Sequence, residues 1–174
     1  MESAAFDYDL PDEAIAQTPA SPRDSSRLLV TGDDVAHLRT RDFPTLLQPG
    51  DVVVLNDTRV LPARMHLAKP TGGQVEVLAL EPAGDGRWEA LVRPSRRVPD
   101  GTVLQSADGA GVLQVDEATG EGTRLVRPLG RAMEQTLATL GSVPLPPYIT
   151  TELADDERYQ TVYAHNRTTN TTPV

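Results

Sequence analysis

The chain has 174 residues, of which 39% are hydrophobic, and this size allows one domain or two small ones. It carries 16 Lys and Arg against 25 Asp and Glu, and the formal net charge of −9 excludes tight, sequence-independent binding of a polyanion over a broad surface. The absence of cysteine excludes disulfides and thiolate chemistry, and no aliphatic run approaches the roughly 20 residues of a membrane-spanning helix.

The amino-terminal part of the chain predicts short elements of both types. A helix is expected over residues 11–17, because a proline precedes two acidic residues in its first turn. Residues 28–30 and 36–40 predict the two arms of a hairpin. Residues 41–50 predict one helical turn, closed by Pro and Gly. The run "VVVL", residues 52–55, then predicts a strand that is buried on both faces.

From residue 63 to about residue 127 the pattern changes to short apolar runs separated by glycine-rich turns. Runs such as "QVEVLAL", "RWEALVR" and "GVLQVDE" alternate with "TGG", "GDG" and "DGAG". Regular short strands with turns predict an antiparallel barrel or sandwich. The lone Trp88 is expected in its core, and the alternative is that Trp88 stacks on a nucleic-acid base.

A helix is predicted after the β-rich part, over residues 130–141. Met133, Leu137 and Leu140 fall on one face of this helix, and Gly141 is its expected stop.

The last thirty-odd residues predict three further segments. Residues 142–149 are extended by their prolines. Residues 154–164 predict a helix with Tyr159 and Tyr163 on one face. The tail, residues 165–174, has no apolar periodicity and is predicted to be disordered.

The sequence lacks the common cofactor and metal motifs. No P-loop occurs, and the Gly-x-Gly pairs at residues 84–86 and 109–111 have no third glycine, so both are predicted as hairpin turns. The three histidines have no zinc-ligand spacing, and no metal site is expected. They are His37, His66 and His165.

Polar side chains follow the predicted buried strand directly, in the sequence "LNDTR". Ligands collect at the carboxyl ends of strands in open α/β sheets, so Asn56 and Asp57 could hold a hydroxylated ligand and Arg59 could meet an anion. The alternative is an Asx turn with Arg59 paired locally. Arg59 and Arg64 can serve one site only if Pro62 bends the chain.

A second polar group is the loop "PRDSSR", just ahead of a predicted strand. Its donors suit a carboxylate, a ribose or a phosphate, and the candidates are Arg23, Asp24, Ser25 and Arg27. The alternative is a self-satisfied surface loop with an Arg–Asp pair of little energetic value.

Two local groups of arginines interrupt the acidic composition of the β-rich part, and each could touch an RNA backbone. The first group is Arg93, Arg96 and Arg97, and the second is Arg124, Arg127 and Arg131.

Six stretches of the chain resemble, in order, the amino-terminal half of the S-adenosylmethionine:tRNA ribosyltransferase-isomerase family of queuosine biosynthesis. The resemblance runs from about Phe6 to Ala164 and is carried by "FDYDLPDEAIAQTPASPRDSSRLLV", "PGDVVVLNDTRVLPAR", "GGQVEVLAL", "RWEALVRP", "VPLPPYI" and "DDERYQTVYA". It implies an α+β fold, in which a distorted α/β barrel domain built from both chain ends carries an inserted antiparallel β-barrel domain. The composition breaks place the incomplete α/β domain at residues 1–62 and 144–174, and the β-barrel domain with its closing helix at residues 63–143.

The resemblance also implies an enzymatic reaction. The ribosyl part of S-adenosylmethionine is transferred to the 7-aminomethyl-7-deazaguanine of tRNA and isomerised to epoxyqueuosine, with release of adenine and methionine. S-adenosylmethionine is then a cosubstrate, and no cofactor is expected. The implied partners are S-adenosylmethionine and a tRNA with a 7-deazaguanine precursor in its anticodon, and a cytoplasmic monomer with no membrane contact is expected.

Side-chain chemistry assigns candidate roles in that reaction. Asp57 is the candidate base or ribose ligand. Candidates for binding the cosubstrate are Asn56, Thr58, Arg59, Arg23, Asp24, Ser25 and Arg27. Candidates for binding RNA are Arg64, Arg93, Arg96, Arg97, Tyr148 and Tyr159.

The sequence departs from the family pattern at its end, because "HNRTTNTTPV" stands where the family continues into a carboxyl-terminal half. We therefore expect an intact β module, a poorly supported α/β part with exposed apolar surface, and little activity from this chain alone. Two alternatives stay open: a truncated, inactive fragment, and a non-catalytic RNA-binding β-barrel module.

Overall fold

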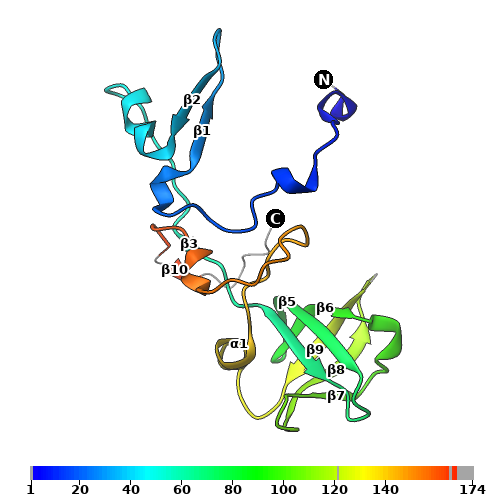
Figure 1. Cartoon of the computed structure of the whole chain (residues 1–174). Helices are drawn as coiled ribbons and strands as arrows, with labels where there is room; N and C mark the ends of the chain where they lie inside the picture. Colours follow the sequence, from blue (N-terminus) through cyan, green and yellow to red (C-terminus); the bar gives the residue numbers. More distant parts are fainter. Residues whose placement is uncertain (1, 121, 165, 168–174) are drawn as a thin grey trace. The chain divides into compact units, whose positions relative to one another are not determined.

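The computed structural model describes residues 2–120, 122–164 and 166–167. The chain divides into two compact units (Figure 1). Unit 1 comprises residues 1–55 and 145–158, and unit 2 comprises residues 56–144 and 159–174.

Unit 2 is built on a closed barrel of six antiparallel strands, in the order β4-β5-β6-β9-β8-β7 (Figure 1). The strands are β4 (Arg64–Ala68), β5 (Gln74–Gly84), β6 (Arg87–Arg93), β7 (Thr102–Gln105), β8 (Gly111–Ala118) and β9 (Thr123–Pro128). The barrel closes where Ala68 of β4 pairs with Gln105 of β7. Closure leaves no free sheet edge. Of the two antiparallel architectures predicted from the alternation of short runs and turns, a barrel and a sandwich, the structure shows the barrel.

The barrel encloses the hydrophobic core of the chain. Alternate residues of each strand point inward, as the burial of Met65 and Leu67 in β4 and of Trp88, Ala90 and Val92 in β6 shows. Burying one large aliphatic or aromatic side chain contributes roughly 1.5–3 kcal/mol, so this interior dominates the stability of the unit. The prediction that Trp88 lies in the core is confirmed.

Helix α1 (Met133–Leu140) follows β9 and packs on the barrel, where the sequence predicts a helix. Met133 and Leu137 are buried, whereas Leu140 lies at the rim and stays partly exposed. Gly141 ends the helix with an ordinary φ of −81°, so left-handed backbone is not the reason for glycine here. A Cβ at this position would overlap the carbonyl oxygen of Pro62, and this close approach requires glycine.

Unit 2 also contains two shorter elements outside the barrel strands. The 3-10 turn η5 (Ser95–Arg97) follows β6. A two-residue strand, β3 (Thr58–Arg59), pairs in parallel with β10 (Asn166–Arg167). Apart from these two residues of β10, the tail predicted to be disordered lies outside the described residues.

Unit 1 consists of one hairpin and several single turns. The hairpin predicted from residues 28–30 and 36–40 is confirmed, because β1 (Arg27–Val30) pairs antiparallel with β2 (Ala36–Arg39). The helical turn predicted for residues 41–50 is present as η4 (Thr40–Leu46). The remaining turns are η1 (Ser3–Phe6), η2 (Asp12–Ala14), η3 (Arg23–Ser25) and η6 (Asp156–Arg158).

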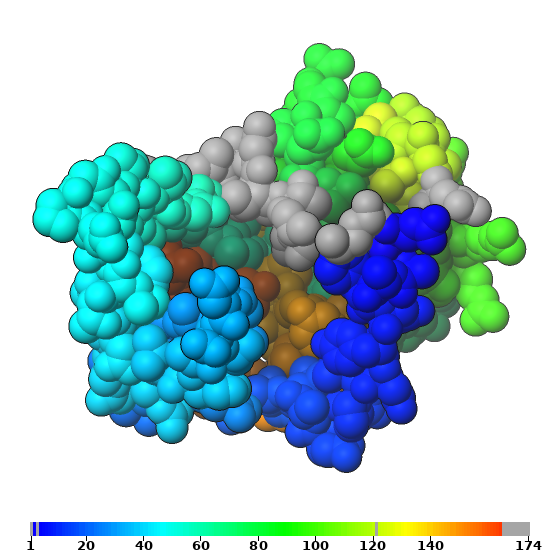
Figure 2. Space-filling model, turned by 90° about the horizontal axis from the view of Figure 1, so that it is seen from above, coloured from blue at the N-terminus to red at the C-terminus, as the bar shows by residue number. Residues whose placement is uncertain are grey.

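Unit 1 has no hydrophobic core. None of its residues whose burial is described is buried, and Figure 2 shows residues from this part of the chain, in blue and cyan, at the surface of that view. Its described elements are a two-stranded sheet and 3-10 turns, so the α/β part of the predicted fold stays a prediction.

The predicted strand at residues 52–55 is wrong. The run "VVVL" has no regular secondary structure and pairs with none of the described strands, and Val52 and Val54 are 85% and 89% exposed. An apolar run becomes a buried strand only where neighbouring strands pair with its backbone and other layers cover its faces, and the described chain supplies neither.

Two predicted helices are also wrong. Residues 11–17 form only the single turn η2, and residues 154–164 form only η6, with Tyr163 about half exposed. A helix this short gains most of its stability from packing an apolar face. Residues 11–17 have no buried side chain, and the buried residues of the second segment, Gln160 and Ala164, pack without forming a helix.

None of the helices in the described part of the chain is long and apolar enough to cross a membrane.

The absence of a core in unit 1 predicts a small unfolding enthalpy. Unfolding absorbs about 0.7 kcal/mol per residue near 60 °C, so melting of the roughly 90 residues from 56 to 144 takes up about 60 kcal/mol, against about 120 kcal/mol for the full chain. We expect a single calorimetric transition near the lower value, coincident with the change in Trp88 fluorescence. One cooperative transition near the higher value would contradict this expectation.

The close approach at Gly141 predicts a specific sensitivity. Gly141→Ala should destabilise unit 2 by about 1–3 kcal/mol, because the new methyl group forces the backbone of Pro62 to move. Urea unfolding followed by fluorescence of Trp88, the chain's single tryptophan, measures the change. Gly32→Ala is the control, because a Cβ there meets only the Asp34 carbonyl oxygen at 3.9 Å. Equal urea midpoints for the two variants would refute the steric argument.

Candidate functional site

The "LNDTR" segment begins unit 2 with an Asx turn. The Thr58 backbone N–H donates to Oδ1 of Asn56 at 2.8 Å, and the Thr161 hydroxyl donates to the Asn56 carbonyl oxygen at 3.5 Å. The local alternative that the sequence left open for Asn56 is therefore present, and its side chain shapes the turn that leads into β3.

Two further contacts hold the chain that follows this turn. Arg59 donates through Nη1 to the Ala164 carbonyl oxygen at 3.4 Å. The buried side chain of Gln160 pairs with the backbone of Val60, accepting its N–H at 2.9 Å and donating to its carbonyl at 3.0 Å. This amide satisfies both backbone groups of Val60, so residues 159–164 are fastened beside β3 without a helix.

The four polar residues differ in exposure. Asn56 and Asp57 are exposed, whereas Thr58 and Arg59 are half-buried. No buried strand precedes them, so the rigid support expected from residues 52–55 is not observed. The segment lines neither the hollow beside α1 nor the hollow beside η5. The assignments of these residues to the cosubstrate stay predictions.

Arg59 and Arg64 point to different partners. The guanidinium of Arg59 contacts the Ala164 carbonyl, whereas Nε of Arg64 lies 3.8 Å from the Glu76 carboxylate across the β4–β5 ladder. These contacts join the two arginines to different groups.

The "PRDSSR" loop belongs to unit 1, and its first arginine crosslinks two distant parts of the sequence. Arg23 donates through Nη2 to the carbonyl oxygens of Glu157 at 3.0 Å and Arg158 at 2.9 Å. In return, Arg158 donates to the Ala20 carbonyl at 2.6 Å. Hydrogen bonds to charged donors are the stronger kind, so this reciprocal pair fastens the two segments of unit 1.

The rest of this loop is also engaged inside unit 1. The Ser25 hydroxyl donates to the Pro22 carbonyl at 2.6 Å, and Asp24 lies 3.8 Å from Arg41 with both side chains about half exposed. Such an exposed ion pair contributes little. Arg27 is exposed on β1, directly opposite Arg39. The polar side chains Arg23, Asp24 and Ser25 thus bond within unit 1. The partner of Asp24 is Arg41 and not an arginine of the loop itself.

Tyr148 and Tyr159 lie in different units. Tyr148 is exposed, and its carbonyl accepts a hydrogen bond from Gln17 at 3.0 Å. Gln17 also accepts the Thr150 backbone N–H at 2.8 Å, so one glutamine ties residues 148–150 to the amino-terminal segment. Tyr159 is half-buried beside Gln160.

The arginines of the barrel separate into exposed and engaged groups. Arg93, Arg96 and Arg97 are exposed, as an RNA-contact surface requires. The second arginine patch expected from the sequence is not one surface, because Arg124 is buried and Arg127 lies 3.8 Å from the Asp116 carboxylate.

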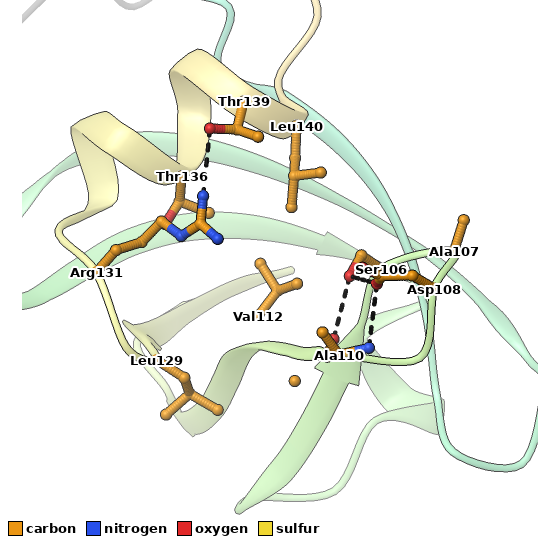
Figure 3. A pocket seen from close by; sticks show the side chains of 11 residues that line it. Ser106, Ala107, Asp108, Ala110, Val112, Leu129, Arg131, Thr136, Thr139 and Leu140 are labelled. Carbon is orange, nitrogen blue, oxygen red and sulfur yellow. Dashed lines mark hydrogen bonds between the residues drawn. The ribbon is translucent and has the colours of Figure 1, made fainter.

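A hollow lies between α1 and the turn that joins β7 to β8 (Figure 3). Val112 and Leu140 face into it, and Arg131 reaches across to donate to the Thr139 hydroxyl at 3.3 Å. Opposite them, Ser106 donates to the Asp108 carboxylate at 2.6 Å, and the same carboxylate accepts the Ala110 backbone N–H at 3.2 Å. The hollow combines an apolar floor with one cation and one carboxylate.

The hydrogen bonds in this turn lower the pKa of Asp108. The Ser106 hydroxyl has the largest effect, followed by the Ala110 N–H, and the positive charge of Arg131 adds a smaller effect in the same direction. A lowered pKa in the folded state stabilises the fold above the ordinary aspartate pKa of about 3.9. This contribution is lost as the pH falls through the lowered pKa.

Sequence reasoning missed three residues that organise the structure. Gln17 and Gln160 fasten backbone segments through their side-chain amides, and a single glutamine in a sequence carries no signal for that role. Arg124 was identifiable in principle, because period-2 alternation in β9 places it on the inward face with Val126.

Within residues 2–120, 122–164 and 166–167 there is no group of three or more His, Cys, Asp or Glu side chains that could hold a metal ion.

Comparison with known proteins identifies relatives over nearly the whole chain. The model of the family described as "Queuosine biosynthesis protein" matches residues 3–174. A protein from Rubrobacter xylanophilus, named S-adenosylmethionine:tRNA ribosyltransferase-isomerase, is 48% identical over 94% of this chain and 49% of its own length. Proteins of the same name from Dehalococcoides mccartyi and Heliobacterium modesticaldum are 45% and 46% identical, and they are covered over 49% and 51% of their lengths. The chain thus spans about half the length of the relatives it matches.

One solved structure is also similar, the crystal structure of an S-adenosylmethionine tRNA ribosyltransferase from Thermotoga maritima. It is 34% identical, and the match covers 78% of this chain and 48% of that chain with a TM-score of 0.38. Because this TM-score is below 0.5, the superposition carries no argument about the fold.

The turn at Asp108 predicts a measurable titration. Ser106→Ala should raise the Asp108 pKa toward its ordinary value, because the hydroxyl is the main group that stabilises the ionised carboxylate. Carbon-13 NMR titration of the side-chain carboxyl measures the shift. Ser142→Ala, which removes a hydroxyl bonded to the Arg64 carbonyl instead, should leave it unchanged. An Asp108 pKa that is the same in both variants would show that Ser106 is not the cause.

Proposed function

Because the chain belongs to the queuosine biosynthesis protein family, we propose that it carries the amino-terminal half of an S-adenosylmethionine:tRNA ribosyltransferase-isomerase. The reaction transfers the ribosyl part of S-adenosylmethionine to the 7-aminomethyl-7-deazaguanine of tRNA and isomerises it to epoxyqueuosine. The observation that carries this proposal is the match itself, which is 48% identity over 94% of the chain to a relative of that name.

The chemistry needs three functions from the protein. A base removes a proton beside the sulfonium, a donor assists the departure of adenine, and hydroxyl-binding groups orient the sugar. We assign the base or ribose contact to Asp57, whose carboxylate is exposed at the start of unit 2. Asn56, Thr58 and Arg59 are assigned to binding of the cosubstrate, with the Asx turn supporting a defined backbone at this position.

The remaining site residues are assigned by their side-chain chemistry. The loop residues Arg23, Asp24, Ser25 and Arg27 are proposed to bind the cosubstrate, and for Arg23 this requires that it exchange or share its carbonyl partners in unit 1. The proposed RNA contacts are Arg64, Arg93, Arg96, Arg97, Tyr148 and Tyr159. No metal or cofactor takes part in this scheme, in which S-adenosylmethionine is a cosubstrate.

The exposed run at residues 52–55 supports the proposed fold plan. Four consecutive aliphatic side chains in water are unfavourable, and the described chain offers them no partner strand. We propose that they form an interior strand of a distorted α/β barrel when the region corresponding to the other half of the relatives is present. Unit 2 then supplies the inserted β-barrel domain, and the chain alone has little activity.

A second candidate function is RNA binding without catalysis, and the exposed arginines of the barrel favour it. This alternative predicts salt-sensitive RNA binding that does not depend on S-adenosylmethionine. The enzyme instead predicts adenine release that requires a precursor tRNA.

Complementation tests the proposed enzyme directly. This chain is mixed with the carboxyl-terminal half of the Rubrobacter xylanophilus relative, and adenine release from S-adenosylmethionine is followed with precursor tRNA. We expect release from the mixture and from neither half alone. The proposal fails if the mixture releases no adenine while the whole relative is active.

In the same assay, Asp57→Asn should lower the rate at least about 100-fold, as the loss of a general base does. Asp85→Asn is the matched control, because Asp85 occupies a barrel turn with φ of 51°, where asparagine is well tolerated. An unchanged rate for the Asp57 variant would dismiss its role as the base.

A further inference from the structure

Four basic side chains lie at one turn of the barrel, and none of them has an acidic partner among the described residues. Arg93, Arg96 and Arg97 are exposed, and among the described residues no carboxylate lies within ion-pair distance of them. Lys69 reaches the same turn, where its Nζ donates to the Arg97 carbonyl at 3.2 Å. In a chain with a net charge of −9, exposed arginines that have no acidic partner in the described part of the chain favour contact with an external anion.

The other barrel strands show that pairing is the rule elsewhere in unit 2. Arg64 lies 3.8 Å from Glu76, Arg87 lies 3.1 Å from Glu117, and Arg127 lies 3.8 Å from Asp116. Glu76 stands opposite Arg93 in the strand register, but its carboxylate contacts Arg64. Among the described residues of unit 2, Arg131 is a further arginine without an ion pair, but it lies beside α1 and bonds to the Thr139 hydroxyl.

Lys69 is the only lysine in the chain, and the backbone around it holds its side chain in place. A Cβ at Gly73 would come within 2.7 Å of Lys69 Cε, so the glycine leaves room for the lysine stem to lie against the backbone. The ammonium is thereby held beside the turn and keeps donors for a second partner.

The buried side chain of Arg124 holds this turn in place through hydrogen bonds. Its side chain makes five hydrogen bonds, to the Asp116 carbonyl twice, to the Ser95 and Val98 carbonyls, and to the Asp100 carboxylate. A guanidinium has five N–H donors, so every donor is used and the buried charge is compensated. These contacts fix both ends of η5, which carries Arg96 and Arg97.

We propose that Lys69, Arg93, Arg96 and Arg97 form a cradle for adjacent phosphates of an RNA backbone, and that Arg124 is a positioning residue that sets its geometry. The planar fork of arginine matches a phosphate in two-point contact, and two neighbouring arginines on a fixed turn suit two successive phosphates. The choice of RNA as partner rests on the proposed function, whereas the anion site rests on the geometry alone.

Salt-dependent binding of a fluorescein-labelled RNA hairpin, measured by anisotropy without S-adenosylmethionine, tests the cradle. Replacing two phosphate contacts should reduce the salt slope by about 1 per residue, so R96Q/R97Q should lower it by about 2 and weaken binding. R87Q/R127Q removes the same charge from paired positions and is the matched control. Equal losses for the two double variants would overturn the proposal.

The positioning role of Arg124 has its own readout. R124K keeps the charge but not the five-donor fork, and should lower the salt slope although Arg96 and Arg97 remain. D100A raises the net charge by one, so a purely electrostatic effect would tighten RNA binding, whereas loss of the Arg124 contact loosens it. Trp88 fluorescence establishes that each variant is folded. Tighter binding by D100A would overturn the positioning role.

Acetylation of the single lysine gives a test without mutation. RNA should slow acetylation of Lys69 several-fold, measured by mass spectrometry, with the amino-terminal amine as internal control. Equal protection by a polyglutamate of matched charge would show a general anion site and overturn the assignment to RNA. None of these binding tests measures turnover. Their outcome is therefore independent of the adenine-release assay, and a failure of the cradle can be distinguished from a failure of the proposed enzyme.

Discussion

Closure of the barrel is the constraint on which the rest of this structure depends. A single pair, Ala68 with Gln105, joins the first barrel strand to β7 and leaves no sheet edge open. The inward side chains, with Trp88 and Met65 among them, then share one hydrophobic interior. Helix α1 can be short because this surface already exists, and Gly141 is required because the helix end returns so close to Pro62.

Unit 1 is organised by a different kind of interaction. Its segments are joined by side chains that bind distant backbone carbonyls, chiefly Arg23 and Arg158 in a reciprocal pair, with Gln17 tying residues 148–150. Such bonds each contribute roughly 0.5–3 kcal/mol, with the higher values for charged donors, and they do not exclude water, so they define local geometry without creating a core. The exposed aliphatics at residues 52–55 are the clearest sign that this unit lacks covering layers.

The surface chemistry of the barrel follows from which arginines are engaged. All five donors of the Arg124 side chain bond within the fold, and these bonds hold the turn that follows β6 in place. The turn then presents Arg96 and Arg97 to solvent, beside Lys69, in a chain that is acidic overall. A local basic surface on an acidic protein favours contact at a defined position over binding along the whole length of a polyanion.

The sequence alone determined what depends on local pattern: the β-barrel from period-2 runs and glycine turns, the hairpin β1–β2, the helix α1 and the family. It could not determine burial, because "VVVL" is identical whether or not other strands cover it. It left the role of Asn56 open between ligand and Asx turn, and only the tertiary structure placed the Thr58 N–H on its side chain. Likewise, Arg124 and Gln160 acquire their partners from segments distant in the chain, and such contacts exist only once the fold has brought those segments together.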